Sequence, residues 1–229
     1  MSRVEVVPDA GMFIKTFPYS HQCLNTKKLK LGVNWASDRA QQRFPEGRSY
    51  NIMGLFFATL KEIAERYDAE IFIIEHLLKE PRNIIVKEEM HKVATEKLGN
   101  RVHFMYDETK EELFPPFDYT APFFADIYRQ MDLVFGMRGH ANIIAFGQNT
   151  PSIGIGQHNK VKWFLEQVNL SSLLVTLDGD DSHIRLNLNQ VADNVINNLN
   201  SYKQTIDNMH TQCAYIKDAA IDKIVKLIK

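Results

Sequence analysis

An arginine and a histidine separated by one residue form the pair in this chain best suited to anion chemistry. Arg138, Gly139 and His140 lie between a short apolar run and a stretch of small and apolar residues. A guanidinium binds two oxyanion oxygens at once, and an imidazole exchanges protons near neutral pH. The pair therefore predicts a site that holds a phosphate or carboxylate and moves a proton.

The segments around this pair predict where it lies. Leu133–Phe135 is expected to be a buried strand, 141–147 a helix and 152–155 a second strand. The end of a parallel strand that leads into a helix collects backbone N–H groups and the positive end of the helix dipole. The next helix opens with His158, Asn159 and Lys160, and the lysine is placed to reach the same anion as a point charge. We therefore predict a donor-binding site at this edge of the sheet.

These segments, in this order, resemble the polysaccharide pyruvyl transferase family. Members share a strand of the type (A/M)DLV(F/I)G, then R-(L/G)-H, a helix of small residues, a P-x-I-x-I strand and a lysine. The matching residues here are Met131–Gly136, Arg138–His140, Pro151–Ile155 and Lys160, with further matches at Pro8-Asp9 and Gly32–Trp35. The resemblance covers roughly residues 1 to 175. Gly139 replaces the more frequent leucine, and we expect it to loosen the turn.

The resemblance implies that the donor is phosphoenolpyruvate, with no further cofactor and no metal. It also implies a sugar of a cell-surface polysaccharide precursor as acceptor, and Arg138 and His140 as catalytic residues. The substrate-binding residues expected are Arg138, Gly139, His140, Lys160, Arg39 and His158. Members of the family have two domains facing across a cleft, and this chain corresponds to the carboxyl-terminal, donor-binding one. The acceptor surface is then expected elsewhere, and the isolated chain is expected to have little or no turnover.

Alternating apolar runs and amphipathic segments predict an α/β fold, a doubly wound parallel sheet of about six strands. A helical carboxyl-terminal extension follows the sheet, and the resemblance implies that the sheet is the Rossmann-like carboxyl-terminal half of a GT-B-type transferase. We expect one domain over 1–229: a crossing segment 1–29, a core 30–180 and helices 181–229. The other predicted strands are 30–35, 69–75, 102–105 and 173–177, and the other predicted helices are 49–67, 84–98, one ending near 130, and two after 186.

Composition narrows the class of partner. The 229 residues carry a formal net charge of −1 and contain two cysteines. This balance gives no reason to expect nucleic acid or an anionic membrane as a partner. No apolar run approaches the ~18 residues of a membrane helix, and the amino terminus does not resemble a signal peptide. We expect a cytoplasmic protein that binds a small donor and a sugar acceptor, and whose uncovered cleft face is compatible with homo-oligomers.

Each candidate residue also has a structural interpretation. Arg138 is suited to an ion pair, His140 to capping a helix and Lys160 to a solvated helix start capped by Asn159. Arg39, Arg43 and Arg48 follow the first strand, and their alternative role is that of ordinary charged residues on the surface. His76 follows the end of another strand, a place where ligands bind in such sheets. Trp163 and Phe164 are expected in the core.

Two other functions remain open at this point. One is a nucleotide-sugar glycosyltransferase of the GT-B type, for which an acid after a late strand would bind the ribose; Asp178, Asp180 and Asp181 are the candidates. The other is a non-catalytic module that binds an anionic ligand. Gly154-Ile155-Gly156 lacks the third glycine of a dinucleotide loop, which argues against a nicotinamide cofactor.

Overall fold

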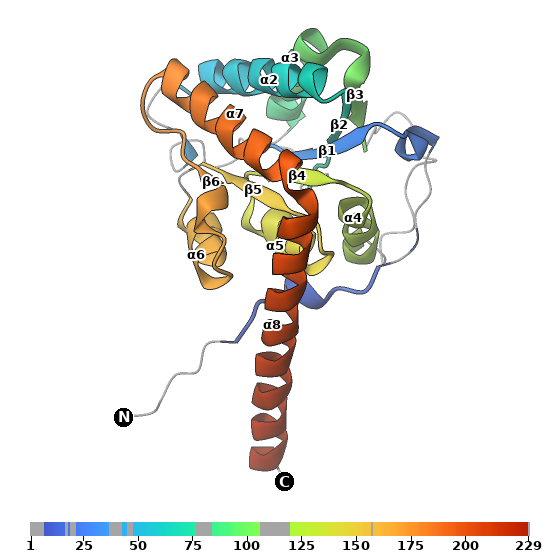
Figure 1. Ribbon diagram of the computed structural model, residues 1–229, viewed down its shortest axis with the longest axis vertical. Helices are drawn as coiled ribbons and strands as arrows, with labels where there is room; N and C mark the ends of the chain where they lie inside the picture. Colours follow the sequence, from blue (N-terminus) through green and yellow to red (C-terminus); the bar gives the residue numbers. More distant parts are fainter. Residues whose placement is uncertain are drawn as a thin grey trace.

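A six-stranded parallel sheet forms the centre of the molecule (Figure 1). The computed structural model describes residues 7–16, 18, 22–36, 43–44, 48–76, 84–105, 120–156 and 158–228. The strand order is β3-β2-β1-β4-β5-β6. The strands are β1 (Leu29–Asn34), β2 (Ala69–Ile73), β3 (Val102–Phe104), β4 (Leu133–Gly136), β5 (Ser152–Ile155) and β6 (Leu174–Val175). All five pairings are parallel, which confirms the predicted fold class.

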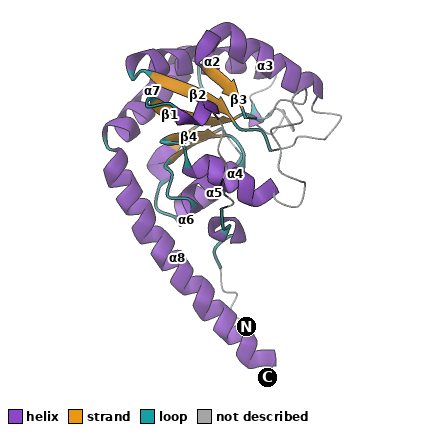
Figure 2. Ribbon diagram, turned by 90° about the vertical axis from the view of Figure 1, so that its right-hand side faces the viewer, coloured by secondary structure: helices purple, strands orange, loops and turns teal. Residues whose placement is uncertain are grey.

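Helices cover both faces of this sheet. The elements α2 (Ser49–Arg66), α3 (Ile84–Leu98) and α7 (Asp181–Asn197) lie on one face. On the other lie α4 (Thr120–Arg129), α5 (Gly139–Gly147) and α6 (Asn159–Gln167) (Figures 1 and 2). Four short 3-10 turns complete the described elements: η1 (Ala10–Phe13), η2 (Gln22–Asn25), η4 (Gly99–Arg101) and η7 (Ser171–Leu173).

The strand sequences explain the two-sided cover. Successive side chains of a strand point to opposite faces, so a strand with helices on both sides is apolar throughout. In β2, Ile71 and Ile73 belong to the larger core cluster beneath α2 and α3, whereas Phe72 packs with Phe123 and Tyr128 of α4. The sheet is therefore buried on both faces.

The last helix, α8 (Leu199–Ile228), runs past the sheet and projects beyond the rest of the molecule (Figures 1 and 2). Its first half is anchored by the buried Ile206 and Cys213, and His210 lies 3.1 Å from the carbonyl oxygen of Met12. Two helices after the sheet confirm the predicted carboxyl-terminal extension. The division into 1–29, 30–180 and 181–229 stays a prediction.

The expected place of one aromatic side chain is wrong. Trp163 was expected in the core, but it is 63% exposed, whereas Phe164 is 5% exposed. The buried residues of α6 are Val161, Phe164 and Leu165, which share one face of the helix at intervals of three and four. Trp163 lies two positions after Val161, so its side chain leaves that face and points to solvent.

Candidate functional site

The centre of the sheet contains a topological switch point. From β1 the chain moves outward through β2 and β3, and it then returns to β4, on the other side of β1, and continues through β5 and β6. In doubly wound sheets, ligands bind outside the carboxyl ends of the strands where the order reverses. Here that position lies above Asn34 of β1 and Gly136 of β4, which are paired in register.

Arg138 and His140 lie directly above the end of β4. Arg138 is the N-cap of α5, with extended backbone angles, and Gly139 and His140 are the first two residues of that helix. The predicted helix therefore begins two residues earlier than expected, and the predicted turn is a helix start. Because the first N–H groups of a helix have no partner within it, an anion beside Arg138 also meets the positive end of α5.

Asn142 fixes this helix start. Its side-chain amide donates to the carbonyl oxygens of Gly136 (2.8 Å) and Arg138 (2.9 Å), so one side chain connects the strand end to the helix. A Cβ on Gly136 would lie 2.7 Å from the amide nitrogen of Asn142, which only glycine avoids. Sequence reasoning missed Asn142, although an asparagine within a helix of small apolar residues is a usable signal.

Lys160 reaches this site from the next helix. Its Nζ lies 3.4 Å from Nε2 of His140 and 3.9 Å from Oδ2 of Asp9. The aliphatic stem of Lys160 passes over Gly139, where an added Cβ would lie 2.9 Å from Cγ and Cδ of the lysine. Gly139 has no positive φ, so its role is to leave space for this stem. The glycine expected to loosen the turn instead lets Lys160 approach His140.

Two further side chains approach from β2 and α4. His76 follows β2, and its Nε2 lies 2.7 Å from the hydroxyl of Tyr128, which is fully buried. Loss of water around the ring, with the positive charges of Arg138 and His140, lowers the pKa of His76 to about 3. Burial raises the pKa of Tyr128 well above its usual range, against the opposing charge of Arg138. Both groups are therefore uncharged near neutral pH.

Three buried polar atoms at this edge have no hydrogen-bond partner among the described residues. They are Oδ1 of Asn34, Nε1 of Trp35 and Oδ1 of Asn142. The amide of Asn34 donates to the carbonyl oxygen of Ile74, 2.7 Å away, which joins the ends of β1 and β2. Buried polar atoms are normally paired, so exceptions call for a bound group or water. All three lie near the switch point, which supports a polar ligand there.

A family model for polysaccharide pyruvyl transferases matches residues 1–159. The chain belongs to this family. A search of curated proteins gives no match.

Two solved structures share the fold of this pyruvyl transferase family chain. A mutant O-GlcNAc transferase of Thermobaculum terrenum is 11% identical with a TM-score of 0.50, and the alignment covers 81% of this chain and 32% of that one. WaaG, a glycosyltransferase involved in lipopolysaccharide biosynthesis, is 13% identical with a TM-score of 0.50, covering 95% and 54% respectively. The chain thus spans between about a third and about half of these structures. The similarity to the two glycosyltransferases agrees with the predicted GT-B-type fold.

The remaining basic candidates of this family member that the structure describes contact the backbone at turns and helix starts. Arg39 lies outside the described residues. Arg43 is buried and donates to the carbonyl oxygen of Met137 at 3.1 Å, so it holds the turn that precedes Arg138. Arg48 donates to the carbonyl oxygen of Gly179 at 2.6 Å and pairs with Asp181. His158 is the N-cap of α6, its Nδ1 accepting from the backbone of Lys160 at 3.2 Å, so this histidine and not Asn159 caps the helix.

Asp132, which belongs to the matched family motif, connects two strands and lies away from the candidate site. The side chain of Asp132 accepts from the backbone N–H of Lys30 at 2.8 Å. This contact lies at the beginning of β1 and β4, at the opposite edge of the sheet from Arg138. Asp132 therefore sets the register of the two central strands.

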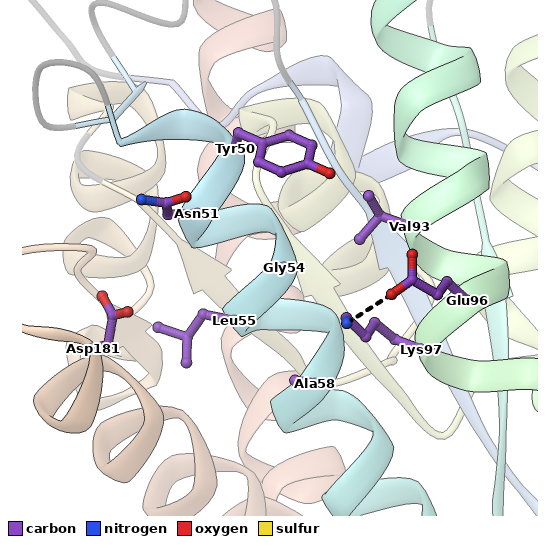
Figure 3. A pocket seen from close by; sticks show the side chains of 9 residues that line it. All are labelled: Tyr50, Asn51, Gly54, Leu55, Ala58, Val93, Glu96, Lys97 and Asp181. Carbon is purple, nitrogen blue, oxygen red and sulfur yellow. Dashed lines mark hydrogen bonds and ion pairs between the residues drawn. The ribbon is translucent and has the colours of Figure 1, made fainter.

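A shallow pocket of about 410 Å³ lies elsewhere, on the outside of α2 and α3 (Figure 3). Its lining includes Tyr50, Val93 and Lys97, and Lys97 pairs with Glu96 at 2.9 Å. It contains none of the residues predicted to bind phosphoenolpyruvate, and of the acids considered for a ribose it contains Asp181, which pairs with Arg48. Since its charged groups at Lys97 and Glu96 neutralise each other, we place the chemistry at the switch point.

The described residues contain neither a helix that could cross a membrane nor a group of three side chains arranged to hold a metal ion.

Proposed function

We propose that this chain binds phosphoenolpyruvate at the carboxyl end of β4 and that the site serves pyruvyl transfer to a sugar of a polysaccharide precursor. The observation that carries the proposal is the grouping of Arg138, His140 and Lys160 at the start of α5, with Lys160 Nζ 3.4 Å from His140 Nε2. Membership of the family supports the same class of reaction.

The charges at the site match this donor. Phosphoenolpyruvate carries a phosphate and a carboxylate close together. Arg138 binds an oxyanion through two parallel hydrogen bonds, whereas Lys160 contributes a compact charge. The first turn of α5 adds backbone N–H groups. Three sources of positive potential therefore converge on a ligand that carries two anionic groups.

The reaction requires one proton at the donor and two hydroxyl groups of the acceptor. A proton is added to the methylene carbon, and positive charge develops at the central carbon. The first hydroxyl oxygen bonds to that carbon, and its proton replaces the one given to the methylene carbon. The second hydroxyl oxygen then bonds to the same carbon as the C–O bond to phosphate breaks; its proton leaves with inorganic phosphate, and the cyclic ketal closes. We assign the proton transfer to His140, because it is exposed at the helix start and its imidazole can donate and recover a proton.

The binding step is tested by calorimetric titration of the chain with phosphoenolpyruvate and with UDP-N-acetylglucosamine. We expect saturable binding of phosphoenolpyruvate that is lost in Arg138→Ala. Arg185→Ala is the matched control, because Arg185 is exposed and pairs with Glu62 on α2, on the opposite face of the sheet from α5. Equal loss in both variants, or no binding by the wild-type chain, would contradict the proposal.

A nucleotide-sugar glycosyltransferase is the second candidate, since the two matching structures are glycosyltransferases. Two of the acids that would bind a ribose are already engaged. Asp180 is the N-cap of α7, accepting from the backbone of His183 at 2.8 Å, and Asp181 pairs with Arg48. Binding of UDP-N-acetylglucosamine in preference to phosphoenolpyruvate would favour this candidate. Binding of phosphoenolpyruvate without phosphate release, when an amino-terminal domain and acceptor are supplied, would favour a non-catalytic module.

A further inference from the structure

The half-buried His76 and the fully buried Tyr128 form a pair beside the proposed site. The ring of Tyr128 lies at 88° to that of His76, with centroids 5.7 Å apart, and Phe124 packs on the same imidazole at 5.3 Å. The two aromatic side chains thus enclose one side of the imidazole. The hydroxyl of Tyr128, 2.7 Å from Nε2, is its polar contact on that side.

The position of His76 relative to Arg138 follows from the strand register. Asn34 ends β1, pairs with Gly136 and donates to the carbonyl oxygen of Ile74. His76 is two residues beyond Ile74, and Arg138 is two residues beyond Gly136. Both residues therefore follow strand ends that lie level with each other on either side of β1. The positive charges of Arg138 and His140 also act on His76, which places it within their field.

Hydrogen-bond balance decides which nitrogen of His76 carries the proton. Among the described residues, Nε2 of His76 is the one partner of the Tyr128 hydroxyl. If Nε2 donated, the buried hydroxyl hydrogen would be left without an acceptor, which is unfavourable. The balanced arrangement has Tyr128 donating to Nε2, and a neutral imidazole then carries its proton on Nδ1.

We infer that His76 is a third donor-binding residue, which presents Nδ1–H to an oxyanion oxygen of the ligand while Tyr128 fixes its tautomer. This inference rests on the proposed function for the identity of the ligand. A neutral N–H donor adds a directed hydrogen bond without a third positive charge beside Arg138 and His140. Such a charge would be disfavoured by both neighbours and by the loss of water around the ring.

The tautomer can be measured without any ligand. Nitrogen-15 NMR of the histidine rings at pH 7, assigned by comparison with Tyr128→Phe, should show His76 protonated at Nδ1 and bare at Nε2. In Tyr128→Phe, which keeps the aromatic ring, the signals should move toward a mixture of both tautomers. Protonation at Nε2 in the wild-type chain would overturn the inference.

Two substitutions test which ring nitrogen of His76 contributes to ligand binding. The amide of asparagine reproduces the position of Nδ1, whereas that of glutamine reproduces the position of Nε2. With phosphoenolpyruvate as the probe, we expect His76→Asn to stay within about threefold of wild type and His76→Gln to lose about tenfold in affinity. Thermal unfolding of both variants checks that they fold. Titration with pyruvate and with inorganic phosphate then tells which oxyanion His76 contacts, as the affinity for that one falls in His76→Gln.

The outcomes distinguish this inference from the proposed function. Binding of phosphoenolpyruvate by the wild-type chain with equal affinities in the two variants would overturn the role of His76 alone. If the chain binds UDP-N-acetylglucosamine and not phosphoenolpyruvate, the same ranking of variants with that probe supports His76 while the proposed donor is wrong. Binding of neither ligand would overturn both.

Discussion

Substitution of Gly139 by alanine should weaken donor binding without weakening the fold. The added Cβ would lie 2.9 Å from Cγ and Cδ of Lys160 and 3.2 Å from its Cε. Carbon atoms prefer separations of about 3.5–4.0 Å, so the lysine stem must shift by roughly 0.5–1 Å. The Nζ of Lys160 is 3.4 Å from Nε2 of His140, at the limit of a hydrogen bond, and this shift breaks the contact.

The expected magnitudes separate binding from stability. The side chain of Lys160 is 44% exposed, so its interaction with an anion is partly screened, and we expect a loss of about 1 kcal/mol, or about fivefold in affinity. The exposed stem adjusts at little cost in unfolding free energy. Gly139 has no positive φ, so its backbone accepts alanine, and the smaller conformational freedom of the unfolded chain should leave stability unchanged or slightly higher.

A double-mutant cycle with calorimetric titration of phosphoenolpyruvate measures the effect. Gly139→Ala should weaken binding about as much as Lys160→Ala, and the two changes together should not add. Gly54→Ala is the matched control, because Gly54 lies within α2 and an added Cβ would meet nothing within 4 Å. It should leave affinity unchanged. Wild-type affinity in Gly139→Ala, alongside weak binding in Lys160→Ala, would refute the reasoning.

Three further outcomes are expected. Arg138→Ala should lose about 10- to 100-fold in phosphoenolpyruvate affinity with an unchanged melting temperature, and unfolding of the variant would instead make Arg138 a structural residue. His140→Gln should keep most of the affinity while phosphate release in a complete enzyme falls by about 10²–10⁴-fold; a near wild-type rate would leave the histidine a positioning role. The pKa of His76, about 3 in the folded chain against its ordinary 6.5, means that only the unfolded chain takes up this proton between those values. Stability should therefore fall as pH drops from 6.5 to 5, by up to about 1.4 kcal/mol per unit, and His76→Gln should reduce that slope in denaturant titrations.

The order of elements allowed the sheet edge to be predicted. Because parallel strands end at one edge, residues that follow β4 and β5 had to lie near each other, and Lys160 does lie beside His140. The helix periodicity of α6 also separates Phe164 from Trp163, but this was overlooked because both are apolar. An apolar side chain favours burial, but its position around the helix decides whether it is buried.

The contacts that connect distant segments could not be predicted. Tyr128 and His76 are 52 residues apart, and no local pattern indicates that a tyrosine in the last turn of α4 reaches the end of β2. Asp9 was matched to the family by sequence, but its approach to Lys160 depends on how η1 packs beside α5. Such contacts follow from tertiary packing, which periodicity does not specify.

The pairing of β1 with β4 also governs how the molecule reaches its folded state. Lys30 and Asp132, which begin this pairing, are 102 residues apart, so a long loop must close before the two strands meet. Contacts of such high sequence separation form slowly, because the entropy of loop closure is lost before the contacts stabilise the chain. His76 lies within this loop, just after β2, whereas Arg138, His140 and Lys160 follow Asp132. A folding intermediate in which β4 has not yet joined β1 thus lacks the complete proposed anion site, and a donor that binds there would stabilise only the fully assembled sheet.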